Sequence, residues 1–229
     1  MYLLELINYR IVSSHENAMQ TFDLAIAPGE RCCIQTSSQR HAHVLLKALA
    51  TLIPPAKGTY RFEGQAVKFG NYRRLLSIKR QIGYIGPDAT LISNRSVLDN
   101  LLLMRYYFEN RFNLTLDDKT DKLCRLFGLF DQLKMRPAEL NPMDFNIAVA
   151  IRELSKSPKL LLLERPENFI GDNRLEVFTS VLKDHLLQKV PIVFISYNHN
   201  FNTTLATNKI LISKGKLTTV PVHKPSPKA

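Results

Sequence analysis

The stretch RPAELNPMDFNIAVAIRELSKSPKLLLLERP, residues 136–166, joins two patterns that decide the fold of this chain. Its first part predicts a helix over 142–156, because Asn141 is a favourable N-cap, Pro142 suits the first helical position and an acid occupies the third. A proline then ends the helical pattern, and the next segment, Leu160–Leu163, is entirely apolar. Such a run is typical of a strand buried on both faces, as in a parallel sheet covered by helices. The stretch therefore predicts an α/β fold.

The same alternation of apolar runs and amphipathic helices continues along the chain. We expect strands at residues 2–8, 20–26, 31–35, 60–62, 66–69, 82–85, 160–163, 192–196, 209–213 and 216–220. We expect helices at 43–52, at 71–80, after a capping box formed by Ser96 and Asp99, at 116–128 with Thr115 as the cap, at 142–156 and at 173–188. This order predicts a mostly parallel core sheet with helices on both faces and an antiparallel β layer from the early hairpins.

The length of the chain is that of one globular domain with a substantial core. We assign residues 1–220 to a single domain and about 86–157 to a helical block inserted between two core strands. The remaining residues, 221–229, read as a disordered basic tail.

Neither the cysteines nor the apolar runs indicate an extracellular or membrane-spanning protein. Cys32, Cys33 and Cys124 have no metal-ligand or disulfide spacing. Cys32 and Cys33 lie on an apolar strand pattern, so we expect these two to be small buried apolar residues, in a reducing cytoplasm. No apolar run approaches the roughly 18 residues that span a bilayer. Glu5 interrupts the N-terminal apolar segment, and we therefore expect neither a secretion signal nor a membrane anchor.

The net charge of +11 favours polyanionic partners, either nucleic acid or the anionic face of a membrane. The basic residues are scattered, and the densest run, from Arg73 to Arg80, lies on one short predicted helix without interleaved aromatic residues. The run predicts a solvated or membrane-facing surface rather than a nucleic-acid site.

Five collinear stretches resemble the ATP-binding subunits of ATP-binding cassette (ABC) transporters over essentially the whole chain. They are FDLAIAPGERCCI (22–34), LLKALATLIPPAKGTYRFEGQ (45–65), IGYIGPDATLI (82–92), the opening stretch 136–166, and VPIVFISYN (190–198). The resemblance implies a P-loop NTPase-like fold with a parallel core sheet, an antiparallel β subdomain and an inserted helical subdomain.

The phosphate loop of this family needs glycines, so that backbone N–H groups approach the phosphates, with a lysine and a Ser/Thr that binds Mg²⁺. The eight matching positions here are Thr36, Ser37, Ser38, Gln39, Arg40, His41, Ala42 and His43. All three glycines are replaced, Ala42 stands at the lysine position, and His43 is a poor partner for a hard cation. Arg40 remains the one candidate for attracting an anion at a helix N-terminus.

Two further motif positions that would contact nucleotide or partner are also changed. The glutamine of the glutamine loop matches Pro87, and the signature LSGGQ matches Leu140 followed by Asn141, Pro142, Met143 and Asp144. The segment makes a sound helix start, but proline has no N–H for a phosphate and the aspartate adds negative charge there.

The remaining catalytic positions differ in the same way. The Walker B strand ends in Glu164 and Arg165 where the family has Asp-Glu, and a protonated guanidinium cannot act as a general base. We expect Arg165 to form a salt bridge with Glu164 or Glu167. The switch histidine matches Tyr197; the D-loop aspartate matches Gly171, and the adenine-stacking aromatic matches Ser13.

The combined losses predict a pseudo-ATPase with no catalytic residue, no metal site and no bound ATP or Mg²⁺. The resemblance implies head-to-tail dimers with the same or another ATP-binding subunit, each site combining one phosphate loop with the other subunit's signature. Both halves are altered here, so a homodimer would have no intact site.

Residues 88–104, DATLISNRSVLDNLLLM, resemble the region where the family's permease docks its coupling helix. With the Arg105-Tyr106 pair that follows, they also resemble ATP-binding subunits of Mce- and Mla-type lipid-transport systems. The resemblance implies a transmembrane permease as partner, contacted by Asp88, Leu91, Ile92, Arg95 and Asn100. The alternative is a capped helix that packs only on its own domain.

We therefore expect a structural or regulatory subunit of a membrane ABC transporter, peripheral on the inner face of the cytoplasmic membrane, and the resemblance implies lipid as its cargo. The first alternative is an unorthodox ATPase that relies on Arg40. The second is a soluble basic nucleic-acid-binding or regulatory protein, which the scattered charge makes the weaker choice.

Overall fold

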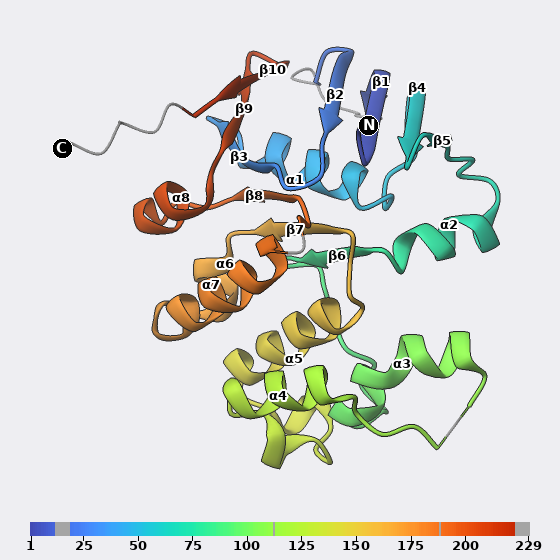
Figure 1. The fold of residues 1–229 in the computed structure, drawn as a ribbon, viewed down its shortest axis with the longest axis vertical. Helices are drawn as coiled ribbons and strands as arrows, with labels where there is room; N and C mark the ends of the chain where they lie inside the picture. Colours follow the sequence, from blue (N-terminus) through green and yellow to red (C-terminus); the bar gives the residue numbers. More distant parts are fainter. Residues whose placement is uncertain (12–18, 112, 188, 223–229) are drawn as a thin grey trace.

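The computed structural model describes residues 1–11, 19–111, 113–187 and 189–222. It contains two β-sheets, and helix α1 packs against strands of both (Figure 1). The expected α/β class, with a parallel core sheet, an antiparallel layer and helices, is confirmed.

The larger sheet has six strands in the order β10-β9-β3-β8-β7-β6. Strands β9, β3, β8, β7 and β6 run parallel to one another. Strand β10, at the other edge, runs antiparallel to its neighbour β9. The strands are β3 (Arg31–Thr36), β6 (Ile82–Ile85), β7 (Leu160–Glu164), β8 (Ile192–Ile195), β9 (Asn208–Ser213) and β10 (Lys216–Pro221).

The smaller sheet is antiparallel, in the order β2-β1-β4-β5. Its strands are β1 (Leu4–Ile11), β2 (Phe22–Ile26), β4 (Pro55–Phe62) and β5 (Gln65–Ala66). The expected hairpin around Gly64 is confirmed, but β4 begins five residues earlier than predicted, and β5 ends at Ala66 rather than Phe69.

The helices are α1 (Gln39–Leu49), α2 (Tyr72–Lys79), α3 (Val97–Glu109), α4 (Asp118–Leu126), α5 (Pro142–Ser155), α6 (Pro166–Ile170), α7 (Asp172–Leu187) and α8 (His199–Leu205). Two short 3₁₀ turns lie at Phe130–Gln132 and Pro137–Glu139. Among the described residues no helix is long and apolar enough to cross a membrane.

Two apolar cores lie on opposite faces of the larger sheet. One is formed by α1, the inner face of the smaller sheet and the sheet residues that face them, such as Ile34 and Leu162. The other joins Leu161 and Leu163 to α3, α4, α5, α6, α7 and α8. Alternate residues of one strand thus enter different cores, which explains why β7 is buried along its whole length.

Local capping signals fix several helix starts. The capping box predicted at Ser96 and Asp99 is confirmed: the Asp99 N–H donates to Ser96 Oγ, and the Ser96 N–H donates to Asp99 Oδ2. The cap of α4 is Asp117 rather than Thr115, because the Asp117 carboxylate accepts the Thr120 N–H at 2.8 Å. The helix consequently begins two residues later than predicted.

Three other predictions need correction. Helix α1 begins at Gln39, four residues before the expected start, and α6 and α8 were not predicted at all. The expected tail began at 221, but Pro221 is the last residue of β10; most of that tail, 223–229, lies outside the described residues.

Candidate functional site

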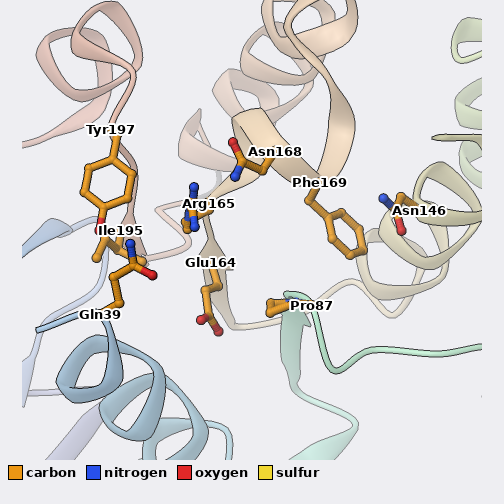
Figure 2. Close-up of a pocket in the computed structure, with 9 residues that line it drawn as sticks. All are labelled: Gln39, Pro87, Asn146, Glu164, Arg165, Asn168, Phe169, Ile195 and Tyr197. Atoms are coloured by element: carbon orange, nitrogen blue, oxygen red, sulfur yellow. The ribbon is translucent and has the colours of Figure 1, made fainter. Parts of the chain in front are cut away.

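An open pocket of about 410 Å³ lies at the carboxyl ends of the parallel strands β6, β7 and β8, beside the start of α1 (Figure 2). This end of a parallel sheet is where α/β proteins bind their ligands. The lining residues are Gln39, Pro87, Asn146, Glu164, Arg165, Asn168, Phe169, Ile195 and Tyr197.

Five of the lining residues were singled out in the sequence, and the fold brings them together from four separate segments. Gln39 comes from the phosphate-loop positions, Pro87 from the glutamine loop, Glu164 and Arg165 from the end of β7, and Tyr197 from the switch position. The sequence did not indicate the other four lining residues as part of a site: Asn146 comes from α5, Asn168 and Phe169 come from α6, and Ile195 ends β8.

The eight phosphate-loop positions form only a short connection between strand and helix. Thr36 ends β3, Ser37 and Ser38 connect, and Gln39 to His43 are already helical. The Ser38 N–H donates to Thr36 Oγ1, while the Ser38 carbonyl accepts the His41 N–H. A helical turn therefore replaces most of the loop, because side chains at the glycine positions favour regular helical backbone.

The side chains of this turn point in different directions. Arg40 is exposed, whereas Ala42, at the lysine position, is buried in the core beneath the smaller sheet. His43 reaches the carboxylate at the end of β7, and Gln39 lines the same pocket.

A chain of polar contacts links α1, β6 and β7. His43 Nδ1 lies 2.9 and 3.0 Å from the two carboxylate oxygens of Glu164, and His43 Nε2 lies 3.4 Å from Asp88 Oδ2. Tyr84 donates its hydroxyl to Glu164 Oε2 at 2.7 Å, and Lys47 donates to Asp88 at 2.7 Å. The buried Glu164 carboxylate is thereby satisfied by two side chains of its own chain.

The surroundings of Tyr84 and Asp88 in this polar network shift the pKa values of both side chains. Burial, followed by the hydrogen bond to Glu164, raises the pKa of Tyr84 far above its ordinary value. The hydrogen bond from Lys47 lowers the pKa of Asp88 below its ordinary value. At neutral pH Tyr84 therefore remains a hydroxyl donor, and Asp88 is ionised opposite Lys47 and His43.

Arg165 does not form the predicted salt bridge. Glu164 and Arg165 point in different directions (Figure 2), and Glu167 already accepts the Ser196 hydroxyl at 2.8 Å and the Tyr197 N–H at 2.9 Å. The Arg165 guanidinium instead lies 5.1 Å from the centre of the Tyr197 ring. Its buried Nε has no hydrogen-bond partner in the described structure.

Arg165 also has an unusual backbone. Its φ of 52° places it in the left-handed region, which disfavours side chains other than glycine, asparagine and aspartate. The turn from β7 into α6 therefore holds a cation at the edge of the pocket in a strained conformation.

The signature segment starts α5 as predicted. Asn141 Oδ1 accepts the Asp144 N–H at 2.9 Å, and Pro142 is the first helical residue. The buried Asp144 carboxylate accepts hydrogen bonds from Gln132, Asn141 and Arg174, the last at 2.9 Å. Arg174, which the sequence did not indicate, thus neutralises the negative charge expected at this position.

Burial opposes the ionisation of Asp144, but the hydrogen bonds from Gln132, Arg174 and Asn141 outweigh it and lower its pKa. The D-loop position, Gly171, has φ 86° and lies against the neighbouring signature residue: a Cβ there would come within 2.8 Å of Met143 Cε. Ser13 lies outside the described residues.

The five residues expected to contact a permease divide into two groups. Asp88, Ile92 and Arg95 are exposed, and they lie in the connection between β6 and α3. Leu91 and Asn100 are buried, with 5% and 1% of their surface exposed, so the expectation is wrong for these two.

Asn100 serves the shape of this connection instead. Its side-chain oxygen accepts the Ile92 N–H at 2.7 Å, and its amide donates to the carbonyls of Ile92 and Ser96. Asn100 thereby holds residues 92–96, defined here as the 92–96 loop, against the start of α3.

No group of three or more His, Cys, Asp or Glu suited to a metal ion occurs in the described parts of the chain.

Comparison with known proteins places these positions in context. No protein-family model matches the chain. It is 22% identical over 210 residues to the methionine import ATP-binding protein MetN of Histophilus somni, which covers 91% of this chain and 61% of MetN. It is 29% identical to the molybdenum import ATP-binding protein ModC of Saccharophagus degradans, covering 75% of this chain and 46% of ModC.

A third relative matches over more of its own length. The lipoprotein-releasing system ATP-binding protein LolD 2 of Chlorobium chlorochromatii is 28% identical, over 81% of this chain and 79% of LolD 2. The chain thus spans about half to three-fifths of the MetN and ModC relatives and more of LolD.

Solved structures show the same fold at lower identity. The dimeric ATP-binding cassette MJ0796 bound to ADP and Pi superposes with a TM-score of 0.80 at 16% identity, covering 96% of this chain and 99% of the other. An ATP-binding subunit of an ABC transporter gives a TM-score of 0.81 at 14% identity, with 96% and 90% covered.

Proposed function

We propose that this chain, a homologue of the ATP-binding subunits of ABC transporters with the fold of their cassettes, is a pseudo-ATPase subunit of a membrane transport complex. In this role it docks onto a permease and contributes structure or regulation, without hydrolysing ATP.

The contact between His43 and Glu164 carries the proposal. His43 holds the position where the family has a hydroxyl ligand of Mg²⁺, and its ring lies 2.9 Å from the carboxylate at the Walker B position. An imidazole is a better ligand for softer cations than for Mg²⁺. Here its ring contacts the Glu164 carboxylate, which would otherwise accept a hydrogen bond from a magnesium-bound water. The residues present therefore do not fit a Mg²⁺–phosphate group.

The remaining parts of the phosphate site support the same proposal. Ala42 is buried and uncharged at the lysine position, and helical backbone replaces the loop whose N–H groups would surround a phosphate. Arg165 cannot act as the general base that the family has at its position, and Tyr197 stands in place of the switch histidine. Loss of one electrostatic catalytic group typically lowers a rate by about 10²–10³-fold, and several are replaced here.

We propose that any dimer of this chain lacks a complete nucleotide site. In a head-to-tail pair, residues 36–43 would face the partner's signature, and Asn141–Asp144 would face the partner's phosphate loop. The Asp144–Arg174 pair supports the proposal, because it presents a satisfied ion pair where backbone N–H groups would be needed. Pairing with an intact subunit would alter both composite sites.

The permease contact is proposed for the exposed part of the 92–96 loop together with Asp88. Ile92 exposes 41% of its surface although it is apolar, and Asn100 fixes the backbone around it. An exposed apolar side chain on a rigid loop suits insertion into a groove of a partner. Such docking would place the chain on the cytoplasmic face of the membrane.

A lipid cargo is proposed from the resemblance of residues 88–106 to lipid-transport subunits. The relatives are named for methionine import, molybdenum import and lipoprotein release, so they do not agree on one cargo. The proposal of a lipid cargo therefore depends on residues 88–106 alone.

Recovery of partners from native membranes tests the docking. Tagged wild-type chain is expected to recover a permease, and Ile92→Glu is expected to lose it. Leu126→Glu is the matched control, because Leu126 is an exposed aliphatic residue on α4. Failure to recover a permease with the wild type, or equal loss in both variants, would contradict the proposal.

Calorimetric titration with Mg-ATP tests the nucleotide site. The proposal predicts no binding heat. Micromolar binding that Arg40→Ala abolishes would instead support an unorthodox ATP-binding subunit.

A further inference from the structure

We propose that α2 and the end of α3 form a surface that binds anionic phospholipid bilayers. We define the α2–α3 surface by three residues of α2, the residue that follows this helix and two residues of α3. They are Tyr72, Arg73 and Arg74, then Arg80, then Tyr107 and Phe108. The inference goes beyond the proposed function, since it requires neither a permease nor the loss of ATP hydrolysis.

The charge of this region is one-sided. Between Gly64 and Pro87 the chain has five basic residues and no acidic one: Lys68, Arg73, Arg74, Lys79 and Arg80. Within the described structure none of the three arginines forms an ion pair with a carboxylate. Their charges are thus available to an external anion.

The acid at this end of α3 is already neutralised. Glu109 accepts hydrogen bonds from Arg105 Nε at 2.7 Å and from Arg105 Nη2 at 3.3 Å. The hydrogen bond from Arg105 is the main cause that lowers the pKa of Glu109, so the glutamate remains an ionised partner of that arginine. The charge of Arg80 also helps to lower the pKa of Glu109, so Arg73 and Arg74 are the arginines of this region that are most available to an external anion.

The aromatic residues of α3 join the basic ones only in three dimensions. The Arg80 guanidinium lies 4.7 Å from the centre of the Phe108 ring, and α2 and α3 lie on the same side of the molecule (Figure 1). Tyr107 packs its ring against Phe108 at 5.1 Å in an edge arrangement. The basic run that had no interleaved aromatics in the sequence thus acquires them from α3.

The aromatic side chains are unusually exposed. Tyr72 exposes 67% of its surface and Tyr107 exposes 63%. The opposite side of α2 is anchored, because Leu75 is buried and Ile78 packs against the core that contains α1. The helix therefore presents its arginines and tyrosine outward from a fixed base.

This combination fits the headgroup region of an anionic bilayer. Arginines attract the negative surface, and a tyrosine places an apolar ring and a polar hydroxyl at the boundary between water and lipid. Stacking of a nucleic-acid base on Phe108 is disfavoured, since Arg80 covers one face of its ring and Tyr107 abuts it. A bilayer needs no free ring face.

Vesicle flotation with the full chain tests the proposal. Binding is measured to phosphatidylcholine vesicles with and without phosphatidylglycerol, over a range of salt concentrations. We expect binding only when phosphatidylglycerol is present, weakening as salt rises. Each arginine near the surface is worth about fivefold in affinity, so Arg73→Gln/Arg74→Gln should weaken binding about 25-fold.

The matched control removes the same charge elsewhere. Lys214 on the turn after β9 and Lys216 at the start of β10 are both exposed, and Lys214→Gln/Lys216→Gln should change vesicle affinity by less than about twofold. Tyr107→Ser should weaken binding at high salt, where the apolar contribution dominates. Unchanged thermal melting curves would show that the variants are folded.

Three outcomes would overturn the proposal. They are no binding to phosphatidylglycerol vesicles at low salt, equal weakening by the two glutamine pairs, and tighter binding of a DNA or RNA oligonucleotide that displaces the vesicles. None of them bears on ATP hydrolysis, so failure here is distinguishable from failure of the proposed function.

Discussion

The end of β7 and the start of α5 both carry replaced motif residues, but the replacements are satisfied in different ways. Glu164 is bonded by His43 and Tyr84, which are 121 and 80 residues away in the chain. At the start of α5, Asn141 caps the Asp144 N–H three residues on, and Arg174 alone comes from a distance. A buried site requires partners from other elements, whereas a helix start is satisfied mainly by its neighbours. Substitutions should therefore cost more at β7.

The largest effect is expected for Glu164→Ala. The change leaves the Tyr84 hydroxyl and the His43 ring without their acceptor in a buried site, and should lower the free energy of unfolding by about 2–4 kcal/mol. Glu164→Gln keeps an oxygen for Tyr84 and should lower it by about 1 kcal/mol. Urea unfolding measures both. Equal effects would show that the contacts at β7 contribute little.

Asp144→Asn tests the ion pair at α5 and its pH dependence. Because the folded state lowers the pKa of Asp144, the carboxylate contributes stability above its unfolded pKa, which is lost as pH falls through its folded pKa. The variant should be less stable by about 1–2 kcal/mol at neutral pH. The difference should shrink below about pH 4.

Urea unfolding of wild type and variant at several pH values measures this difference. The exposed Asp118→Asn is the control and should change stability by less than about 0.5 kcal/mol. A difference for Asp144→Asn that persists undiminished in acid would contradict the ionic account of this contact.

Asn141→Ala should have a smaller effect. Removing the cap of α5 is expected to lower stability by about 1 kcal/mol, whereas Asn141→Ser retains an acceptor for the Asp144 N–H and should remain close to wild type. Thermal unfolding measures the ranking. If serine were as destabilising as alanine, the side-chain cap would not be the source of stability.

The smallest effect is expected for Arg165→Gly. Glycine adopts the left-handed backbone of this position without steric cost, but it gains freedom in the unfolded chain and removes the contact with Tyr197. The opposing effects should leave stability unchanged or raised by about 1 kcal/mol. A loss of more than about 1 kcal/mol on urea unfolding would mean that the cation–aromatic contact outweighs the backbone strain.

Local sequence patterns predicted the parts of the fold that local interactions determine. The apolar run of β7, the capping box at Ser96 and the Asn141-Pro142 helix start all appear in the structure. Each depends on residues within four positions of one another, so the sequence contains the whole signal.

The errors arose where the family resemblance or a short segment obscured the local signal. The predicted start of α1 lies four residues after Gln39, because the resemblance assigns positions 36–43 to a phosphate loop, although they contain no glycine. Helix α8 has a cap at Asn198 and apolar Phe201 and Leu205 four residues apart, but its seven residues are too few for a clear period.

Long-range pairs in the candidate site could not be predicted. The sequence identified Glu164 and Asp144 but not Tyr84 or Arg174, because partners separated by 80 and 30 residues leave no periodic signature. The Arg165 salt bridge was wrong for the same reason: Ser196 and the Tyr197 N–H already occupy Glu167.

The rate of Mg-ATP hydrolysis by the purified chain tests the central claim most directly. The chain should release no phosphate above the background set by the Glu164→Ala variant, alone or with its permease. Turnover in the range of typical enzymes, about 1 s⁻¹ or more, that disappears in Glu164→Ala would contradict the account.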